Sequence, residues 1–266
     1  RIRGTGKRSF GSRWHRFTRR RPRNIEPMAA LAREAGVRLH PNVETNKSPW
    51  IAHKQIAAGA SGITVAQLGQ VEVMPEASIT DTLLAYPIVG ELKLRRRECL
   101  LNEADLISSV DSVETAEGMA SAVRRSGRGT ARVYIDVHTG HQRMGLPSGK
   151  ATVELAERIA RFRELQVVGL MSHAGHLMSS PSQSALAEAA RRAAESLVET
   201  AEILRRRGLP IEQISPGSTP GARYEAVVPG VTEIRPGTYI FNDRNTIDRW
   251  AATEEDCALT VLATVV

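Results

Sequence analysis

The 266-residue sequence predicts an α/β fold, and within that class a (β/α)8 TIM-type barrel made as one domain. Three observations support this prediction. Strand-like and helix-like segments alternate from residue 24 to residue 250, eight strand segments can be counted, and several of them are nearly continuous apolar runs. Such runs are typical of parallel strands covered by helices. An open, doubly wound parallel sheet stays the alternative, because eight strands can also lie in a row.

The elements follow in a regular order. NIEPMAALAREAG (24–36) predicts a helix, with Asn24 as its cap, Pro27 in its first turn and Gly36 at its end. A strand is expected at 37–45, followed by a short helix at 48–60. The other strands are expected at 62–66, 82–88, 105–110, 131–138, 165–174, 211–216 and 232–241. Apolar residues that recur every three or four positions predict further helices, such as 151–165 and 183–208.

No apolar run approaches the roughly 20 residues that a membrane span needs. The two cysteines, Cys99 and Cys257, lie far apart, and neither has a neighbour at metal-ligand spacing. We therefore expect a soluble, cytoplasmic protein without a disulfide framework and without a membrane partner.

The net charge of +7 comes from the N-terminal segment, residues 1–23, which holds nine Arg, one Lys and no acid. Without these ten cations, 26 of the 36 Lys and Arg residues face 29 Asp and Glu residues, so the remainder has a net charge of −3. We expect this segment to be disordered or not authentic, and we predict no nucleic-acid partner. A basic arm that binds phosphates and an Arg-rich transit peptide stay alternatives.

The pattern changes after residue 250. WAATEEDCALTVLATVV (250–266) ends in an alternating, β-branched run without a helix after it. We therefore expect residues 251–266 to provide the first strand of an incomplete C-terminal β domain.

Functional residues of barrels gather at the C-terminal ends of the strands. SPGSTPGA (215–222) and RPGTY (235–239) are Gly-containing turns with hydroxyl groups, and they follow the last two predicted strands. Barrels commonly bind a phosphate at this location. Each turn taken alone is also compatible with an ordinary loop.

Two further strand ends carry polar side chains. SHAGH (172–176) contains His173 and His176, but no third metal ligand is evident, so we predict no metal site. A histidine here is expected to pack against a planar ligand or to hydrogen-bond a backbone group. DVHTGHQRMG (136–145) contains Arg143, which could hydrogen-bond an oxyanion or be solvated.

The order of these segments resembles the alanine racemase N-terminal-domain family of fold type III pyridoxal 5'-phosphate (PLP) enzymes, and within it the D-threonine aldolase and D-serine dehydratase branch. The resemblance runs from about Asn24 to Val266. It is carried by HPNVET (40–45), ITVA before Gln67, LLAYPIVG (83–90), TGHQRMG (139–145), SHAGH, SPGSTP and EIRPGTYIFND (233–243). It implies a barrel joined to a C-terminal β domain, a homodimer, the cofactor PLP and a small D-amino acid substrate.

The resemblance also implies roles for single residues. Arg143 faces the phenolic oxygen of the cofactor, and Gln67 lines its ring. His173 stands against the pyridine face, with Arg235 near the ring nitrogen. The phosphate lies in the two glycine turns, at Ser218, Thr219, Gly237 and Thr238, with Tyr239 next to them. The family's divalent metal, where present, belongs to the C-terminal domain, so we predict none in this chain.

Two positions depart from the family pattern R-P-H-x-K-T-H-K. Glu44 stands where the family has its Schiff-base lysine, and a carboxylate cannot form an imine. Lys47 lies three residues further on and points to the opposite face if the chain stays extended, so we expect that it does not substitute. Met178 replaces a tyrosine that often follows the histidine pair.

The resemblance implies a PLP-dependent lyase of the D-threonine aldolase type, which cleaves a D-3-hydroxy amino acid to glycine and an aldehyde. D-serine dehydratase is a close alternative. Because of Glu44, a non-catalytic PLP-binding protein is a third interpretation.

Overall fold

The computed structural model describes residues 23–100, 105–127 and 129–259. The basic segment predicted at 1–23 lies outside the described residues except for Arg23. The last residues of the strand predicted for a C-terminal domain, 260–266, lie outside them as well.

Eight parallel strands surround the centre of the molecule at the predicted positions. The main sheet has the order β2-β3-β4-β5-β7-β8, and β1 pairs with β9 in parallel. A short extra strand, β6 (Leu146–Pro147), pairs with the end of β5. The eight strands are β1 (Arg38–Leu39), β2 (Ile63–Val65), β3 (Asp81–Leu84), β4 (Asp105–Val110), β5 (Ala131–His138), β7 (Leu165–Met171), β8 (Gln213–Ser215) and β9 (Glu233–Ile234).

Backbone hydrogen bonds connect the β1-β9 pair to both edges of the main sheet. On one side, Ser61 N–H donates to Leu39 O at 2.9 Å, and Asn42 forms a parallel bridge with Thr64. On the other side, Thr232 N–H donates to Ile214 O at 3.1 Å. The strands therefore follow one another around a closed circle. The predicted (β/α)8 barrel is confirmed, and the open-sheet alternative is wrong.

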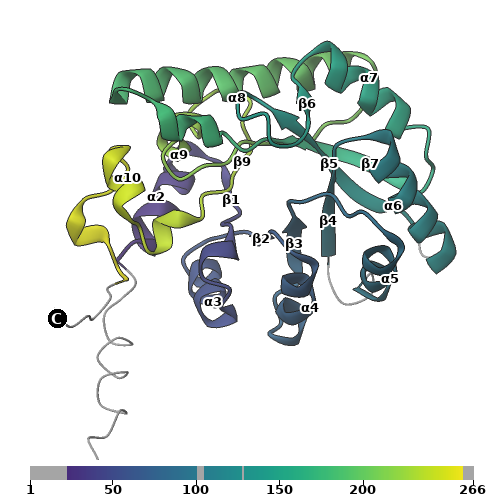
Figure 1. The fold of residues 1–266 in the computed structure, drawn as a ribbon, viewed down its shortest axis with the longest axis horizontal. Helices are drawn as coiled ribbons and strands as arrows, with labels where there is room; N and C mark the ends of the chain where they lie inside the picture. Colours follow the sequence, from purple (N-terminus) through teal and green to yellow (C-terminus); the bar gives the residue numbers. More distant parts are fainter. Residues whose placement is uncertain (1–22, 101–104, 128, 260–266) are drawn as a thin grey trace, which may run out of the picture.

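The helices lie around the strands, as Figure 1 shows. Serine side chains cap three of them by accepting backbone N–H groups, for example Ser112 from Thr115 and Ser182 from Ala185, both at 3.2 Å. The helices are α2 (Ile25–Ala35), α3 (Pro49–Ala57), α4 (Leu68–Glu76), α5 (Glu91–Leu100), α6 (Val113–Ser126), α7 (Lys150–Ile159), α8 (Gln183–Arg206), α9 (Ala222–Glu225) and α10 (Arg244–Asp248).

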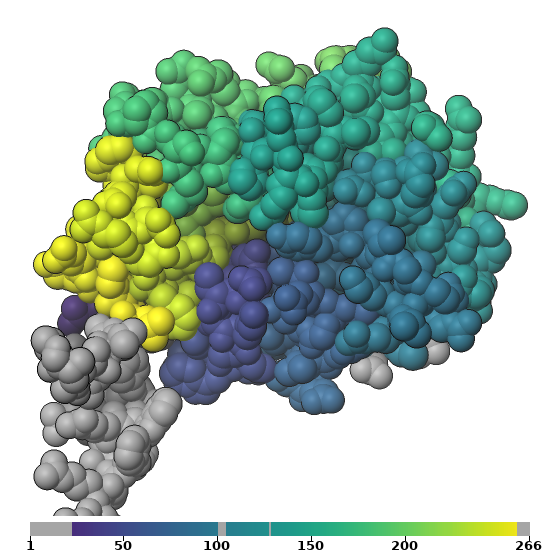
Figure 2. All heavy atoms as spheres, in the orientation of Figure 1, coloured from purple at the N-terminus to yellow at the C-terminus, as the bar shows by residue number. Residues whose placement is uncertain are grey.

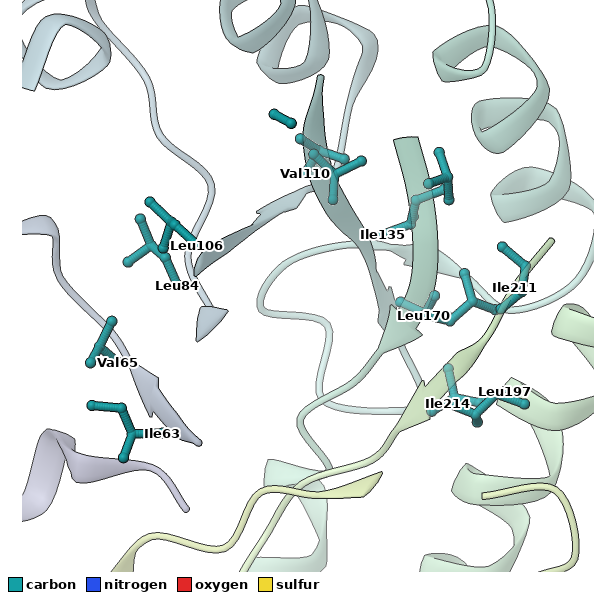
Figure 3. Close-up of a cluster of buried hydrophobic side chains, with 14 of the residues drawn as sticks. Ile63, Val65, Leu84, Leu106, Val110, Ile135, Leu170, Leu197, Ile211 and Ile214 are labelled. Atoms are coloured by element: carbon teal, nitrogen blue, oxygen red, sulfur yellow. The ribbon is translucent and has the colours of Figure 1, made fainter. Parts of the chain in front are cut away.

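The hydrophobic core fills the space between the strands and this helical layer. Figure 3 shows Leu197 of α8 next to Ile214 of β8, and Leu170 of β7 close to both. All three side chains are completely buried. Burial of a side chain of this size stabilises the folded protein by about 1.5–3 kcal/mol relative to exposure. The barrel is therefore stabilised because its apolar strands pack against the apolar faces of the helices.

The first helix and the last described residues lie side by side, purple against yellow in Figures 1 and 2. Asn24 Nδ2 donates to Ile240 O at 3.2 Å and to Asp256 O at 2.8 Å. The prediction that Asn24 caps α2 with its side chain is wrong, because the amide is engaged by these distant carbonyl groups.

Two predicted strands are shorter than expected. The segment 37–45 is extended only at its start, and it continues as the 3-10 helix η1 (Val43–Thr45). The segment 232–241 ends in the 3-10 helix η3 (Thr238–Ile240). In the segment 251–266, the described residues contain the 3-10 helix η4 (Glu254–Asp256) and no strand.

Candidate active site

A cavity of about 700 Å³ opens at the C-terminal ends of the barrel strands. Nine of the eleven residues predicted for the site line it, and they come from six different strand ends. Lys47 and Tyr239 do not line it. The nine are Glu44, Gln67, Arg143, His173, Ser218, Thr219, Arg235, Gly237 and Thr238.

The two glycine turns lie next to each other and present hydroxyl groups to the cavity. Ser218 Oγ accepts a hydrogen bond from Gly221 N–H at 3.0 Å. Thr219 Oγ1 accepts from Gly237 N–H at 3.3 Å and from Tyr239 N–H at 3.2 Å. Because both oxygens act as acceptors, each hydroxyl keeps its own hydrogen to donate to an anion.

Gly237 is required by a close approach between the second turn and the first strand end. A Cβ at Gly237 would lie 2.9 Å from the backbone oxygen of Asn42. The same two segments are joined by Asn42 N–H, which donates to Pro236 O at 3.0 Å, and by Thr45 Oγ1, which donates to Gly237 O at 3.1 Å. The cradle formed by the glycine turns is therefore fixed to the segment that carries Glu44.

His173 is held as a neutral ring. Its Nδ1 lies 3.0 Å from Gly217 O, and since a carbonyl oxygen can only accept, Nδ1 carries the proton. Burial, together with charge repulsion from Arg143 and Arg235, lowers the pKa of His173 to about 4. At neutral pH the ring is therefore uncharged, and it can pack against a planar ligand.

Arg235 is buried, and hydrogen bonds to Ser172 and Ser215 fix its guanidinium. Its Nε donates to Ser215 Oγ at 2.9 Å, and its Nη2 donates to Ser172 O at 2.5 Å and Ser215 O at 3.0 Å. Burial lowers the pKa of Arg235, while the nearby acids, Glu233 first, oppose this effect. The guanidinium therefore has a fixed position at the cavity floor.

Asp136 is a cavity residue that the sequence did not identify. It lies on β5 and is 4% exposed. Burial raises the pKa of its carboxyl to about 7, although Arg235 and Arg143 act in the opposite direction. Asp136 can thus gain or lose a proton near neutral pH.

Arg143 itself stacks over the ring of Tyr86, with 5.1 Å between its guanidinium carbon and the ring centre.

The turn after β1 bears on the expectation about Lys47. Asn42 Oδ1 accepts from Glu44 N–H at 3.0 Å, and Lys47 N–H donates to Val43 O at 2.7 Å, so the chain curls instead of staying extended. Lys47 lies two residues beyond the 3-10 helix η1 (Val43–Thr45), where the turn directs its side chain toward Glu44. Lys47 Nζ accordingly lies 3.4 Å from Glu44 Oε1. The expectation that Lys47 points to the opposite face assumed an extended chain, and this condition is not met.

Tyr239 acts through its backbone. Its side chain is buried, and Gln55 Nε2 donates to its hydroxyl oxygen at 2.8 Å. Burial raises the pKa of this phenol. The side chain thus joins η3 to α3, while the N–H group supports Thr219 in the cradle.

Several lining residues come from outside the predicted strand ends. The segment that begins α10 contributes Asp243, Asn245 and Thr246. Asp243 Oδ1 accepts from Thr246 N–H at 2.9 Å, and this D-x-x-T cap was a signal in the sequence for a helix start near the site. Met178 also lines the cavity.

Histidines gather beside the cavity without forming a metal centre. His141 and His173 meet edge to face with 5.6 Å between ring centres. Within the described ranges, no group of three or more His, Cys, Asp or Glu side chains is arranged to hold a metal ion. In the same part of the chain, no helix is long and apolar enough to cross a membrane.

Residues 24–245 match the family described as alanine racemase, N-terminal domain. The chain therefore belongs to this family, and the resemblance inferred from the sequence is confirmed.

Relatives of this chain include dehydratases and aldolases that act on D-amino acids, as well as alanine racemases. The chain is 38% identical over 253 residues to D-threo-3-hydroxyaspartate dehydratase of Delftia sp. (strain HT23). The matched region covers 93% of this chain and 65% of the relative. It is 28% identical over 220 residues to D-threonine aldolase of Arthrobacter sp., covering 83% of this chain and 58% of the relative. The chain thus spans less than two thirds of the length of these relatives.

Solved structures of a dehydratase and an aldolase are also similar to this chain. The dehydratase of Delftia sp. HT23 superimposes with a TM-score of 0.83 and 36% identity, covering 89% of this chain and 62% of that chain. D-threonine aldolase from Filomicrobium marinum superimposes with a TM-score of 0.81 and 29% identity, covering 85% and 61%.

Proposed function

We propose that this chain is the PLP-binding barrel of a lyase that acts on D-3-hydroxy amino acids. The observation that carries the proposal is the convergence of nine residues, chosen by their positions in the sequence, on one cavity at the functional end of the barrel. Family membership and the names of the relatives support the same assignment.

The residues present fit PLP in three respects. The free hydroxyl hydrogens of Ser218 and Thr219 suit its phosphate. The neutral ring of His173 suits its planar ring, and Arg143 and Arg235 supply positive charge toward an anionic ligand. Neither arginine has a carboxylate within ion-pair distance among the described residues. When bound, PLP would withdraw electrons from the α-carbon of the amino acid.

The protein groups would then bind the ligand and control protons. The anchored Arg235 has no proton to give under ordinary conditions, because a guanidinium stays charged. The pKa of Asp136, about 7, lets its carboxyl hold or release a proton close to the ligand. The walls of the barrel, which bury Arg235, would limit the access of water.

The relatives favour elimination of water over aldol cleavage as the reaction. Identity is 38% to the D-threo-3-hydroxyaspartate dehydratase and 28% to the D-threonine aldolase. We therefore propose a dehydratase first, and an aldolase of the D-threonine type second. Glu44 favours a third function, binding of PLP without catalysis. The homodimer, the cytoplasmic location, the C-terminal β domain and its divalent metal stay predictions.

Cofactor binding and product analysis test the proposal. We expect PLP to bind, and Ser218→Ala combined with Thr219→Val to weaken it at least about tenfold, since hydrogen bonds to a charged group contribute roughly 1.5–3 kcal/mol each. Ser180→Ala, at a half-buried position directly after the 3-10 helix η2 (Gly175–Ser179), is the control. With PLP present, dehydration yields a 2-oxo acid and ammonia, whereas aldol cleavage yields glycine and an aldehyde.

Substrates for this assay are D-threo-3-hydroxyaspartate, D-threonine and D-serine. Absence of PLP binding would contradict the whole proposal. Binding without turnover of any substrate would support the non-catalytic alternative.

A further inference from the structure

The turn after β1 brings a lysine to the wall of the cavity. Glu44 is part of that wall, and its Oε1 lies 3.4 Å from Lys47 Nζ. The lysine side chain is about half exposed, at 55%, so its amino group is accessible from solvent. The amino group therefore lies at the mouth of the site, although Lys47 does not itself line the cavity.

The backbone at Lys47 is strained. Its φ of +48° belongs to the left-handed region, which glycine and asparagine occupy more readily than lysine. The conformation is fixed by Lys47 N–H, which donates to Val43 O, and by Ser48 N–H, which donates to Asn46 Oδ1 at 2.9 Å. Strain of this kind gathers at functional sites.

The same turn is attached to the anion cradle. Thr45 Oγ1 donates to Gly237 O at 3.1 Å, and Asn42 N–H donates to Pro236 O at 3.0 Å. The positions of the turn and of the cradle are therefore coupled. A ligand whose phosphate is bound by Ser218 and Thr219 shares its cavity with the segment that carries Lys47.

The other described lysines are directed elsewhere. Lys54 stacks over the ring of Trp50 at 4.4 Å, and Lys150 is 90% exposed and pairs with Glu154. Lys93 is exposed on α5. Among the described residues, Lys47 is thus the lysine that contacts the cavity wall.

We propose that Lys47 binds PLP covalently, with Glu44 holding its amino group at the cavity mouth. This inference rests on the proposed function, and it gives the chain an amine despite the carboxylate at position 44. The ammonium of Lys47 first releases a proton to solvent. The free amine attacks the aldehyde carbon, a carbon–nitrogen double bond forms, and the aldehyde oxygen leaves as water.

Borohydride reduction of the full chain with PLP, followed by peptide mass spectrometry, tests the proposal. We expect the reduced adduct at Lys47, and at least a tenfold lower total incorporation in Lys47→Ala. Lys54→Ala is the matched control and should retain the wild-type incorporation. Inorganic phosphate should suppress the label at Lys47 if the cradle directs the cofactor. A Glu44→Lys variant provides a reference adduct at the family position.

Equilibrium dialysis of PLP without reduction separates the two proposals. If PLP binds but the adduct is absent at Lys47, or is spread equally over the exposed lysines, the role of Lys47 is wrong and the cofactor site stands. If PLP does not bind, the proposed function fails together with this inference.

Discussion

Glu225 is a carboxyl group enclosed in the wall next to the anion cradle. It is completely buried, and neither oxygen has a hydrogen-bond partner among the described residues. A Cβ on Gly221 would lie 2.6 Å from its Oε1 and also 2.6 Å from Ser218 Oγ, so the carboxyl packs against the first glycine turn. Burial raises its pKa to about 8, with Arg235 acting in the opposite direction.

The raised pKa of Glu225 predicts a pH-dependent stability. Between pH 4.5, the ordinary value, and about pH 8, the folded protein keeps a proton that the unfolded chain releases. The contribution of Glu225 to the unfolding free energy therefore decreases as pH rises through this window. Glu225→Gln stays neutral, so relative to wild type it should be more stable at pH 8 than at pH 5, by at least about 1.4 kcal/mol.

Urea denaturation of both proteins at pH 5 and pH 8 measures this difference. The exposed Glu199→Gln, on α8, is the control and should show the same offset from wild type at both pH values. Other titrating groups, such as His173 and Asp136, affect both proteins equally and cancel. An unchanged offset for Glu225→Gln would show that the carboxyl is ionised in the folded protein.

Single residues also mark where sequence reasoning ended. Arg143 and His173 were found because they follow apolar strands, and Gln67 was found through the family resemblance. The buried acids Asp136 and Glu225 were not, because acids usually lie at the surface and their burial is set by segments distant in the sequence. The segments that bury these two acids come together only when the barrel has closed.

At the scale of elements, the strand positions were predictable because each strand is a short apolar run between turns. The 3-10 helix η1 (Val43–Thr45) was missed, although Pro41 followed by Asn42 is a turn signal. What forms the turn is the set of contacts with the Pro236–Gly237 backbone, almost 200 residues away. Local patterns do not contain such contacts.

The loop between β5 and β6 offers a test of backbone packing. Gly145 has a φ of +82°, and a Cβ there would lie 2.4 Å from Asp136 O. Gly149 has a nearly equal φ of +83°, but its Cβ would meet open space. Alanine is strained by the positive φ at both positions. Only in Gly145→Ala does the added Cβ also collide with β5 and push the loop away from it.

Gly145→Ala should therefore lower the unfolding free energy by about 2 kcal/mol more than Gly149→Ala. Because the loop carries Arg143, PLP affinity should fall in Gly145→Ala and stay unchanged in Gly149→Ala. Denaturation curves and PLP titrations of the two variants give both quantities. Equal effects of the two substitutions would mean that the loop relaxes without contact with β5.

For the whole molecule, eight strands and their order around the barrel followed from the sequence, whereas the way the barrel closes did not. The closing strands β1 and β9 have only two residues each, and polar side chains join them inside the barrel. Ser215 Oγ donates to Glu233 Oε1 at 2.6 Å, and Glu233 Oε2 lies 3.6 Å from Arg38 Nη1. These contacts cross three neighbouring strands.

Glu233 is the central acid of this closure. It is 1% exposed, it pairs with Arg38 across the β1-β9 ladder, and through Ser215 it reaches the buried Arg235. Glu233→Gln keeps the size of the side chain but removes its charge, which leaves two guanidinium groups with less compensation. We expect a loss of about 3 kcal/mol in the unfolding free energy, as for other buried ion pairs that lose one partner.

Glu212→Gln is the matched control, because Glu212 is exposed just before β8 and forms no ion pair among the described residues. It should change stability by less than about 0.5 kcal/mol. Because salt screens buried pairs poorly, the loss in Glu233→Gln should persist in 1 M NaCl, where the Debye length is about 3 Å. Denaturation in low and high salt distinguishes a buried ion pair from a solvent-exposed one. If the loss of stability disappears in high salt, Glu233 is in contact with solvent. Backbone hydrogen bonds alone would then close the barrel.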